Sequence, residues 1–205
     1  MRDYPGAAGA TLSFGNYAAR LQSVLRRAKW DAAASLAAEL LDCWKTGRQV
    51  FLCGNGGSAA NALHIANDLI YGIGDGQRPG LRIHALPANS PVVTCLANDE
   101  GYAEIFSLQL RACARRGDVL IALSGSGNSA NVLRAIEEAR SLGVKSFAIL
   151  GFDGGRAKSL VDVPIHFPVD DMQISEDLQL IIAHMTMQWL KDRATSASSA
   201  VPMSA

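Results

Sequence analysis

Two glycine-rich segments of the 205-residue chain carry hydroxyl and amide side chains in a pattern that suits an anionic ligand. Residues 54–58 read GNGGS, and residues 124–129 read SGSGNS. Each segment follows a short apolar run and opens a helical pattern. Glycines let backbone N–H groups approach an anion closely, and a helix N-terminus adds free N–H donors and partial positive charge. The pattern predicts two phosphate-binding loops; two ordinary strand-to-helix turns with serine N-caps are the alternative.

The first loop differs from the common nucleotide-binding motifs. A dinucleotide-binding fingerprint needs glycine at the sixth position of GxGxxG, and residues 54–59 read GNGGSA. No lysine follows in the manner of a P-loop. A sugar phosphate is therefore a better candidate ligand than a nucleotide.

His64 and Asp68 lie behind the first loop at a spacing of four residues. On a helix this spacing puts both side chains on one face, and imidazole nitrogen with carboxylate oxygen suits zinc. Glu176 and His184 are eight residues apart, about 12 Å along a regular helix, so they meet one ion only by leaning together. The plainer alternatives are a half-buried His64 bonded to a carbonyl and a core histidine at 184.

Short apolar runs alternate with amphipathic segments and predict the elements that position these residues. Strands are expected at 49–54, 82–86, 118–123, 145–150 and 163–169. Helices are expected at 13–27, 31–46, 58–72, 90–98, 102–115, 129–143 and 174–191, with a disordered tail at 193–205. This alternation predicts an α/β fold with a parallel sheet, in which ligands bind beyond the carboxyl ends of the strands.

The composition narrows the class of protein. The chain has 19 basic and 19 acidic residues, which argues against a nucleic-acid partner. No apolar run approaches the roughly 20 residues of a membrane span, and no signal-peptide pattern opens the chain. The four cysteines lack metal-binding spacing, and Cys53 and Cys95 lie in apolar runs typical of reduced core thiols. We therefore expect a cytoplasmic protein.

Residues 10–192 resemble the sugar isomerase (SIS) domain family as one domain, and most closely the phosphoheptose isomerases. The resemblance rests on residues 54–69, 96–102 and 117–139 and on a C-terminal helix that carries His184. It implies a flavodoxin-like, doubly wound five-stranded parallel sheet with an N-terminal helical pair, assembled as a homotetramer with active sites at subunit interfaces. It also implies isomerisation of sedoheptulose 7-phosphate to D-glycero-D-manno-heptose 7-phosphate, a step toward heptose for surface glycans.

The resemblance assigns roles position by position. The phosphate-binding serines are Ser58, Ser124, Ser126 and Ser129. The other residues expected to contact the sugar are Asn55, Gly56, Gly57, Asp99 and Glu176. The metal ligands, usually for zinc, are His64, Asp68, Glu176 and His184, and the catalytic pair is Asp68 with His184.

Three positions depart from the family pattern. Asp68 stands where glutamate is usual, Glu176 stands where glutamine is usual, and Gly72 stands where some members carry arginine. These departures leave another ketose phosphate open as the substrate.

The residue types fit aldose–ketose isomerisation. Moving a carbonyl between neighbouring carbons passes through an enediol or enediolate, so a carboxylate and an imidazole can carry the protons, and a metal ion can stabilise the oxyanion. The alternative is a SIS-domain binding protein, such as the relative that binds the replication initiator. That relative lacks the acid at position 68 and the histidine at position 184, and this chain keeps both.

Overall fold

The computed structural model describes residues 7–74 and 79–198. The chain divides into two compact units, Met1–Trp30 and Asp31–Ala205. The described part of the first unit contains helix α1 (Ala7–Arg27), and the second unit contains the whole sheet. The two helices expected as an N-terminal pair therefore fall in different units, and the single domain over 10–192 stays a prediction.

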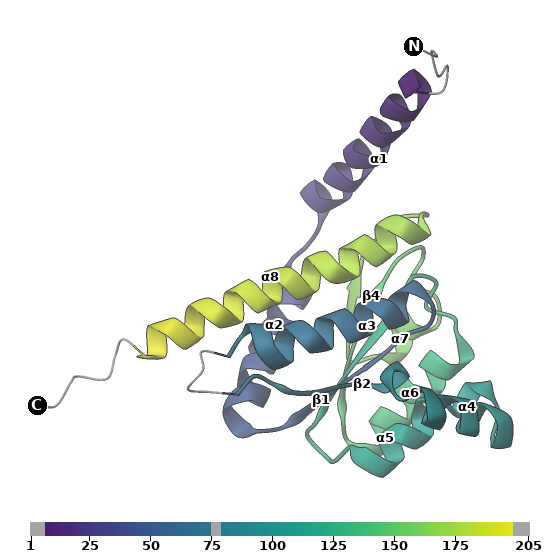
Figure 1. Cartoon of the computed structure of the whole chain (residues 1–205), viewed down its shortest axis with the longest axis vertical. Coiled ribbons are helices and arrows are strands. Elements are labelled where there is room, and N and C mark those ends of the chain that lie inside the picture. Colours follow the sequence, from purple (N-terminus) through teal and green to yellow (C-terminus); the bar gives the residue numbers. More distant parts are fainter. Residues whose placement is uncertain (1–6, 75–78, 199–205) are drawn as a thin grey trace, which may run out of the picture. The chain divides into compact units, whose positions relative to one another are not determined.

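The second unit is built on a five-stranded parallel sheet, which confirms the predicted fold class (Figure 1). Its strands are β1 (Gln49–Cys53), β2 (Arg82–Ala85), β3 (Val119–Ser124), β4 (Lys145–Leu150) and β5 (Val163–His166). They pair in the order β2-β1-β3-β4-β5, and every pair is parallel. This order is that of flavodoxin-like folds, in which a ligand binds between β1 and β3 where the strand order reverses.

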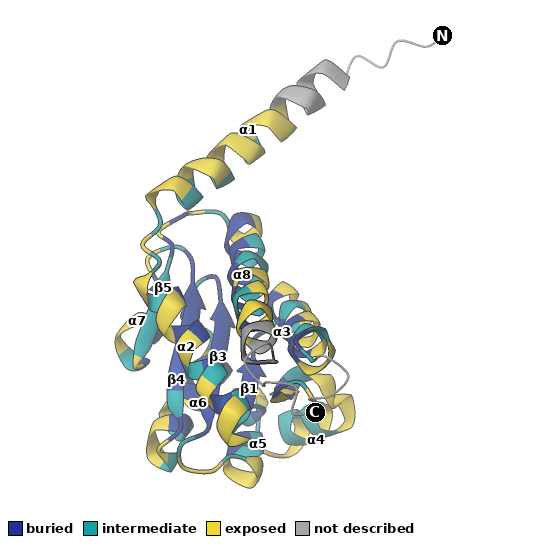
Figure 2. Cartoon of the chain, turned by 90° about the vertical axis from the view of Figure 1, so that its left-hand side faces the viewer, coloured by how far each residue is buried: buried dark blue, intermediate teal, exposed yellow. Residues whose placement is uncertain are grey.

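Helices cover both faces of the sheet, and the three central strands between them, β1, β3 and β4, are buried (Figure 2). On one face α8 (Met172–Ser198) packs on α2 (Asp31–Thr46) and α3 (Gly57–Asn67). On the other face lie α5 (Ser107–Cys113), α6 (Ala130–Leu142) and α7 (Ala157–Leu160), with α4 (Ser90–Asp99) beside them.

The alternation of side chains along the buried strands divides the core between the two faces. Phe51 and Cys53 of β1 join the cluster formed with α5 and α6. Leu52, between them, lines a small apolar cavity on the opposite face together with Leu40 of α2 and Ile65 of α3. A strand that is apolar on both sides thus holds α3 on one face and α6 on the other.

The structure corrects several boundaries. The helix expected over 102–115 is a 3₁₀ turn, Tyr102–Glu104, followed by α5, because the Ser107 hydroxyl bonds the Glu104 carbonyl and carboxylate and closes a turn between them. Helix α7 was not expected, since four residues are too few to show helical periodicity. Helix α8 continues to Ser198, beyond the end expected at 191, and residues 199–205 of the expected disordered tail lie outside the described part.

Cys95 is exposed, and the expectation of a core thiol there is wrong. It lies on α4, a helix without a buried residue, and its thiol donates to Asp99 Oδ2 at 3.4 Å. Cys43 and Cys53 are buried, and burial raises the pKa of the Cys53 thiol to about 12. All four cysteines are free.

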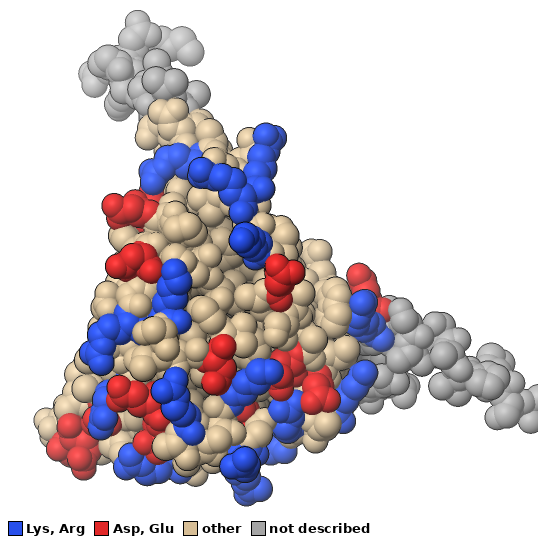
Figure 3. Space-filling model, turned by 180° about the vertical axis from the view of Figure 1, so that it is seen from behind, with Lys and Arg blue, Asp and Glu red and all other residues tan. Residues whose placement is uncertain are grey.

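Surface charges of both signs are mixed. Figure 3 shows Lys and Arg side chains interspersed with Asp and Glu over most of one face. Several are paired, as in Arg111 with Glu138 at 2.7 Å and Arg134 with Glu104 at 2.8 Å. In the part of the chain that the structure describes, no helix has the length and apolar character needed to cross a membrane.

Candidate functional site

The second glycine-serine loop joins the end of β3 to the start of α6, at the carboxyl end of the sheet. The buried Ser124 hydroxyl accepts a hydrogen bond from the Gly127 N–H at 3.0 Å and so closes the loop on itself. The Ser126 hydroxyl accepts from the Asn128 N–H at 3.3 Å. Ser129 is the N-cap of α6, yet its side chain makes no capping hydrogen bond. The hydroxyl of Ser129 is thus not committed to the helix that it precedes.

The first loop joins β1 to α3, and its last side chain faces the core. Ser58 is 4% exposed, and its hydroxyl accepts from Gln179 Nε2 of α8 at 2.9 Å. Gln179 is fully buried, and its amide oxygen accepts from Asn61 Nδ2 at 2.9 Å. Sequence reasoning missed Gln179; the one signal for it is a glutamine inside the apolar stretch 178–183.

Glu176 of α8 covers the start of α3. A Cβ added to Gly57 would lie 2.3 Å from both carboxylate oxygens of Glu176, so a larger residue at this position would require the Glu176 carboxylate to move. The preceding Gly56 has φ +53°, a left-handed conformation that glycine adopts without strain. A carboxylate at a helix N-terminus is favourably placed. The Glu176 carboxylate therefore lies at the N-terminus of α3, where the sequence predicts that an anionic ligand binds.

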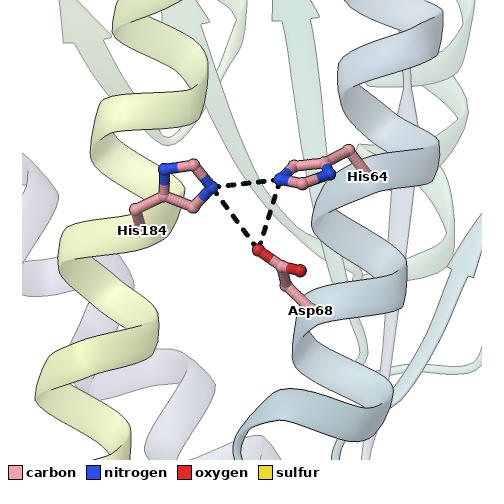
Figure 4. A group of neighbouring side chains, drawn as sticks. All are labelled: His64, Asp68 and His184. Atoms are coloured by element: carbon pink, nitrogen blue, oxygen red, sulfur yellow. Dashed lines mark hydrogen bonds and ion pairs between the residues drawn. The ribbon is translucent and has the colours of Figure 1, made fainter.

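His64, Asp68 and His184 form a group that could hold a metal ion (Figure 4). The His64 and His184 Nε2 atoms are 3.0 Å apart, and Asp68 Oδ2 is 3.4 Å from each. The side chains of His64 and His184 are 48% and 47% exposed. The alternative of a core histidine at 184 is therefore wrong. Glu176, also expected as a ligand, is not a member of this group.

The donor atoms of this group fit a tetrahedral ion. Atoms about 2.0–2.2 Å from a tetrahedral zinc ion lie roughly 3.3–3.6 Å from one another. The three observed separations are 3.0, 3.4 and 3.4 Å. Two imidazoles and one carboxylate leave a fourth position for a substrate oxygen, as in catalytic zinc sites.

A π-helical turn, Asp68–Gly72, begins at the acidic member of this group. Such turns are rare and occur frequently at functional sites. Here the Leu81 N–H donates to the Leu69 carbonyl at 2.9 Å, so this carbonyl is satisfied from outside the turn. A Cβ on Gly72, where some members of the family carry arginine, would lie 2.4 Å from Met187 Cε, so the glycine lets the Met187 side chain of α8 pack closely on the turn. The turn ties Asp68 to α8, the helix that carries His184.

Asn55 is the half-buried amide of the first loop, and it reaches the start of α6. It forms two hydrogen bonds of 2.8 Å with Asn131, one in each direction. The Tyr102 hydroxyl also donates to Asn55 Oδ1, at 3.1 Å. These contacts join the two loops at the point where the strand order reverses. Neither Asn131 nor Tyr102 was expected at the site, although both lie within the segments that carry the family resemblance.

Asp99 is exposed at the end of α4. Its carboxylate accepts from Asn98 Nδ2 at 2.7 Å and from the Cys95 thiol. These two hydrogen bonds, that from Asn98 first, hold the pKa of Asp99 below its usual value. Asp99 is therefore an ionised acceptor at neutral pH, suited to bonding sugar hydroxyl groups.

Comparison with known proteins agrees with this geometry. The SIS domain family matches residues 13–151. The phosphoheptose isomerase of Chlorobaculum parvum (strain DSM 263 / NCIMB 8327) is 38% identical over 174 residues, 84% of this chain and 83% of the relative.

Solved structures show the same relationship. The phosphoheptose isomerase GmhA from Neisseria gonorrhoeae has a TM-score of 0.82 at 28% identity, covering 90% of this chain and 98% of that chain. A phosphoheptose isomerase from Francisella tularensis has a TM-score of 0.83 at 26% identity, covering 91% and 98%. The chain belongs to the SIS domain family and, within it, to the phosphoheptose isomerases.

Proposed function

We propose that this protein isomerises sedoheptulose 7-phosphate to D-glycero-D-manno-heptose 7-phosphate. The observation that carries the proposal is the convergence of Asp68 with His184 from two distant helices, within 3.4 Å of each other. A carboxylate and an imidazole at one open position are the groups that an aldose–ketose isomerase needs. The relatives that this chain matches over most of its length are named phosphoheptose isomerases.

The phosphate is assigned to the second loop. Ser126 and Ser129 are partly exposed there, and the Ser129 hydroxyl is not used to cap α6. The first loop is less suited, since the Glu176 carboxylate covers the start of α3 and would repel a phosphate dianion. Its residues Asn55, Gly56 and Gly57 are assigned to the sugar chain instead.

The reaction is assigned to Asp68 and His184. One group removes a proton from C1 of the ketose and a proton returns to C2, while the hydroxyl proton passes between O1 and O2. The enediol formed between these transfers is an isomer of both substrate and product, so the reaction needs no oxidant, reductant or co-substrate. Because both side chains reach one point, they can serve the carbon and the oxygen transfers from neighbouring positions.

We assign a divalent metal to His64, Asp68 and His184, and their nitrogen and oxygen donors favour zinc. When bound, zinc would act as a Lewis acid and stabilise negative charge on the substrate oxygens. Glu176 remains a proposed ligand or sugar contact; it would have to turn away from Gly57 to reach the metal.

The enzyme is proposed to be a homotetramer with active sites at subunit interfaces, in the cytoplasm. Apolar side chains are exposed beside the histidines on the same helices: Leu63, Ile70, Tyr71 and Met185. Tyr71 is 86% exposed, and exposed apolar side chains that gather in one patch mark protein–protein interfaces. A second copy of the chain would cover these side chains and enclose the half-exposed His64 and His184. The free cysteines support a reducing compartment.

The test is incubation of the purified protein with a panel of ketose phosphates of five to seven carbons, with the products identified by NMR. We expect turnover of sedoheptulose 7-phosphate to the heptose 7-phosphate. If the enzyme prefers another ketose phosphate, we would attribute this preference to Asp68, Gly72 and Glu176, the three residues that depart from the family pattern. Tight binding without turnover of any member would support a regulatory binding protein instead.

A further inference from the structure

Asn131 is a buried amide whose orientation is fixed by the backbone. It is 1% exposed, at the start of α6. Its Oδ1 accepts from the Val132 N–H at 2.9 Å. A backbone N–H can only donate, so the amide oxygen of Asn131 must face it and the amide nitrogen must point the other way.

The orientation of Asn131 determines that of Asn55. The two side chains form a reciprocal pair in which each amide donates to the other at 2.8 Å. Turning the Asn55 amide over would place nitrogen against nitrogen and oxygen against oxygen, which loses both hydrogen bonds. Because Asn131 is held by the backbone, Asn55 has one favourable orientation.

The pair leaves Asn55 with a single kind of free group. Its Oδ1 accepts from both Asn131 Nδ2 and the Tyr102 hydroxyl, which uses both lone pairs. One of the two N–H groups of Asn55 Nδ2 is used by Asn131 Oδ1. The remaining N–H belongs to a half-buried side chain of the first glycine loop.

We infer that Asn131 is a positioning residue that makes Asn55 a hydrogen-bond donor, and not an acceptor, toward an oxygen atom of the phosphorylated sugar. The inference rests on the proposed function for the identity of the ligand. A fixed donor binds a carbonyl or hydroxyl oxygen and binds an enediolate oxygen more strongly, because it needs no reorientation as charge develops. Tyr102 has the secondary role of occupying the second lone pair of Asn55 Oδ1.

Asn131→Asp distinguishes a positioning role from a merely structural one, because its effect should depend on pH. The introduced carboxyl group has nearly the shape of the amide. When protonated it donates an O–H to Asn55 Oδ1 and accepts from Asn55 Nδ2, as the amide does. When ionised it can only accept hydrogen bonds, so it repels Asn55 Oδ1. The Asn55 amide is then no longer held in one orientation.

We therefore expect kcat/KM of Asn131→Asp to fall about tenfold or more below wild type at pH 8. The deficit should shrink as the pH is lowered toward 5 and the introduced carboxyl becomes protonated. Tyr102→Phe removes one donor without adding a charge, so its smaller loss should stay constant over the same pH range. Thermal unfolding of each variant reports whether it is folded under the assay conditions.

Asn55→Asp tests the donor role directly and covers the case in which Asn131→Asp does not fold. Its ionised carboxylate keeps acceptors and loses the free N–H, so kcat/KM should fall about tenfold or more at pH 8. Wild-type kcat/KM in Asn55→Asp would overturn the inference, as would an Asn131→Asp deficit that does not change with pH. Either result, with an active wild type, would leave the proposed function intact.

Crystal structures of Asn131→Asp at pH 8 and pH 5 separate the two proposals. The inference predicts that the Asn55 side chain turns away from position 131 at pH 8 and returns at pH 5. An Asn55 side chain that keeps its place at both pH values would overturn it. This measurement decides the inference even if the wild type converts no ketose phosphate, a result that would count against the proposed function alone.

Discussion

The Nε2 atoms of His64 and His184 lie 3.0 Å apart, although the two residues are 120 positions apart in sequence. His64 comes from α3 and His184 from α8 (Figure 4). The π-helical turn Asp68–Gly72 also contacts α8. Two unprotonated imidazole nitrogens repel at this distance, so either one carries a proton or both direct lone pairs at one cation. The distance between the two imidazoles therefore depends on whether a proton or a metal cation lies between these nitrogens.

Metal content gives the first prediction. Gently purified protein should contain up to one equivalent of zinc or another divalent ion per chain, and chelation should lower turnover. His64→Asn and Asp68→Asn each remove a donor, so each should lower bound metal by about tenfold or more. His84→Asn is the matched control: His84 bonds Gln49 and stacks on Phe51, away from the group. Full turnover of metal-free protein would leave the three residues as acid–base groups only.

Alanine variants of the serines in the second loop should distinguish effects on phosphate binding from effects on the stability of the fold. Ser129→Ala removes a hydroxyl that makes no capping bond, so KM should rise about tenfold with little change in the free energy of unfolding. Ser126→Ala should act in the same direction. Ser124→Ala leaves the Gly127 N–H without its acceptor and should also lower stability, by about 1–3 kcal/mol. An unchanged KM in the Ser126→Ala, Ser129→Ala double variant would remove the phosphate from this loop.

Ser58 is predicted to matter for the stability of the fold. Ser58→Ala leaves the buried Gln179 amide N–H without its acceptor, which should cost about 1–3 kcal/mol in urea-induced unfolding. Ser159→Ala is the control: this exposed hydroxyl donates to the Arg156 carbonyl, and its loss should cost less than about 0.5 kcal/mol. Equal stability of the two variants would show that the bond between Gln179 and Ser58 contributes nothing.

Assembly gives a further prediction. Light scattering at micromolar concentration should show a tetramer, and a 21.7 kDa monomer would contradict the proposed interfacial site. Tyr71→Glu puts a charge on the exposed apolar surface and should shift the protein to smaller species with lower activity. Arg116→Glu changes an exposed charge in the turn before β3, at the opposite end of the strand from the glycine loop, and should leave the assembly unchanged.

The central strands β1, β3 and β4 could be predicted because they are buried on both faces and read as nearly unbroken apolar runs. Residues 145–150 match β4 at both ends. Helices α2 and α6 were also predicted well; α2 has the expected bounds, Asp31–Thr46. The division of residues 102–115 was missed because it depends on hydrogen bonds from the Ser107 side chain, which leave no hydrophobic period.

The candidate site was predictable only in part, for a related reason. The spacing of His64 and Asp68 places them on one face of the helix predicted over 58–72, so their proximity could be predicted from local sequence. His184 joins them through the packing of α8 on α3, which spacing within α8 cannot show. The position of Glu176 over Gly57 and the pairing of Asn55 with Asn131 likewise depend on contacts between distant segments.

The central claim is that Asp68 and His184 carry protons in the isomerisation of sedoheptulose 7-phosphate. Its most direct test is the kcat of Asp68→Asn and His184→Asn on this substrate, with Asp68→Glu as the control that keeps a carboxylate. We predict that each asparagine variant stays folded and loses about 10²–10⁴-fold in kcat, whereas Asp68→Glu loses far less. Wild-type turnover in both asparagine variants would contradict the account.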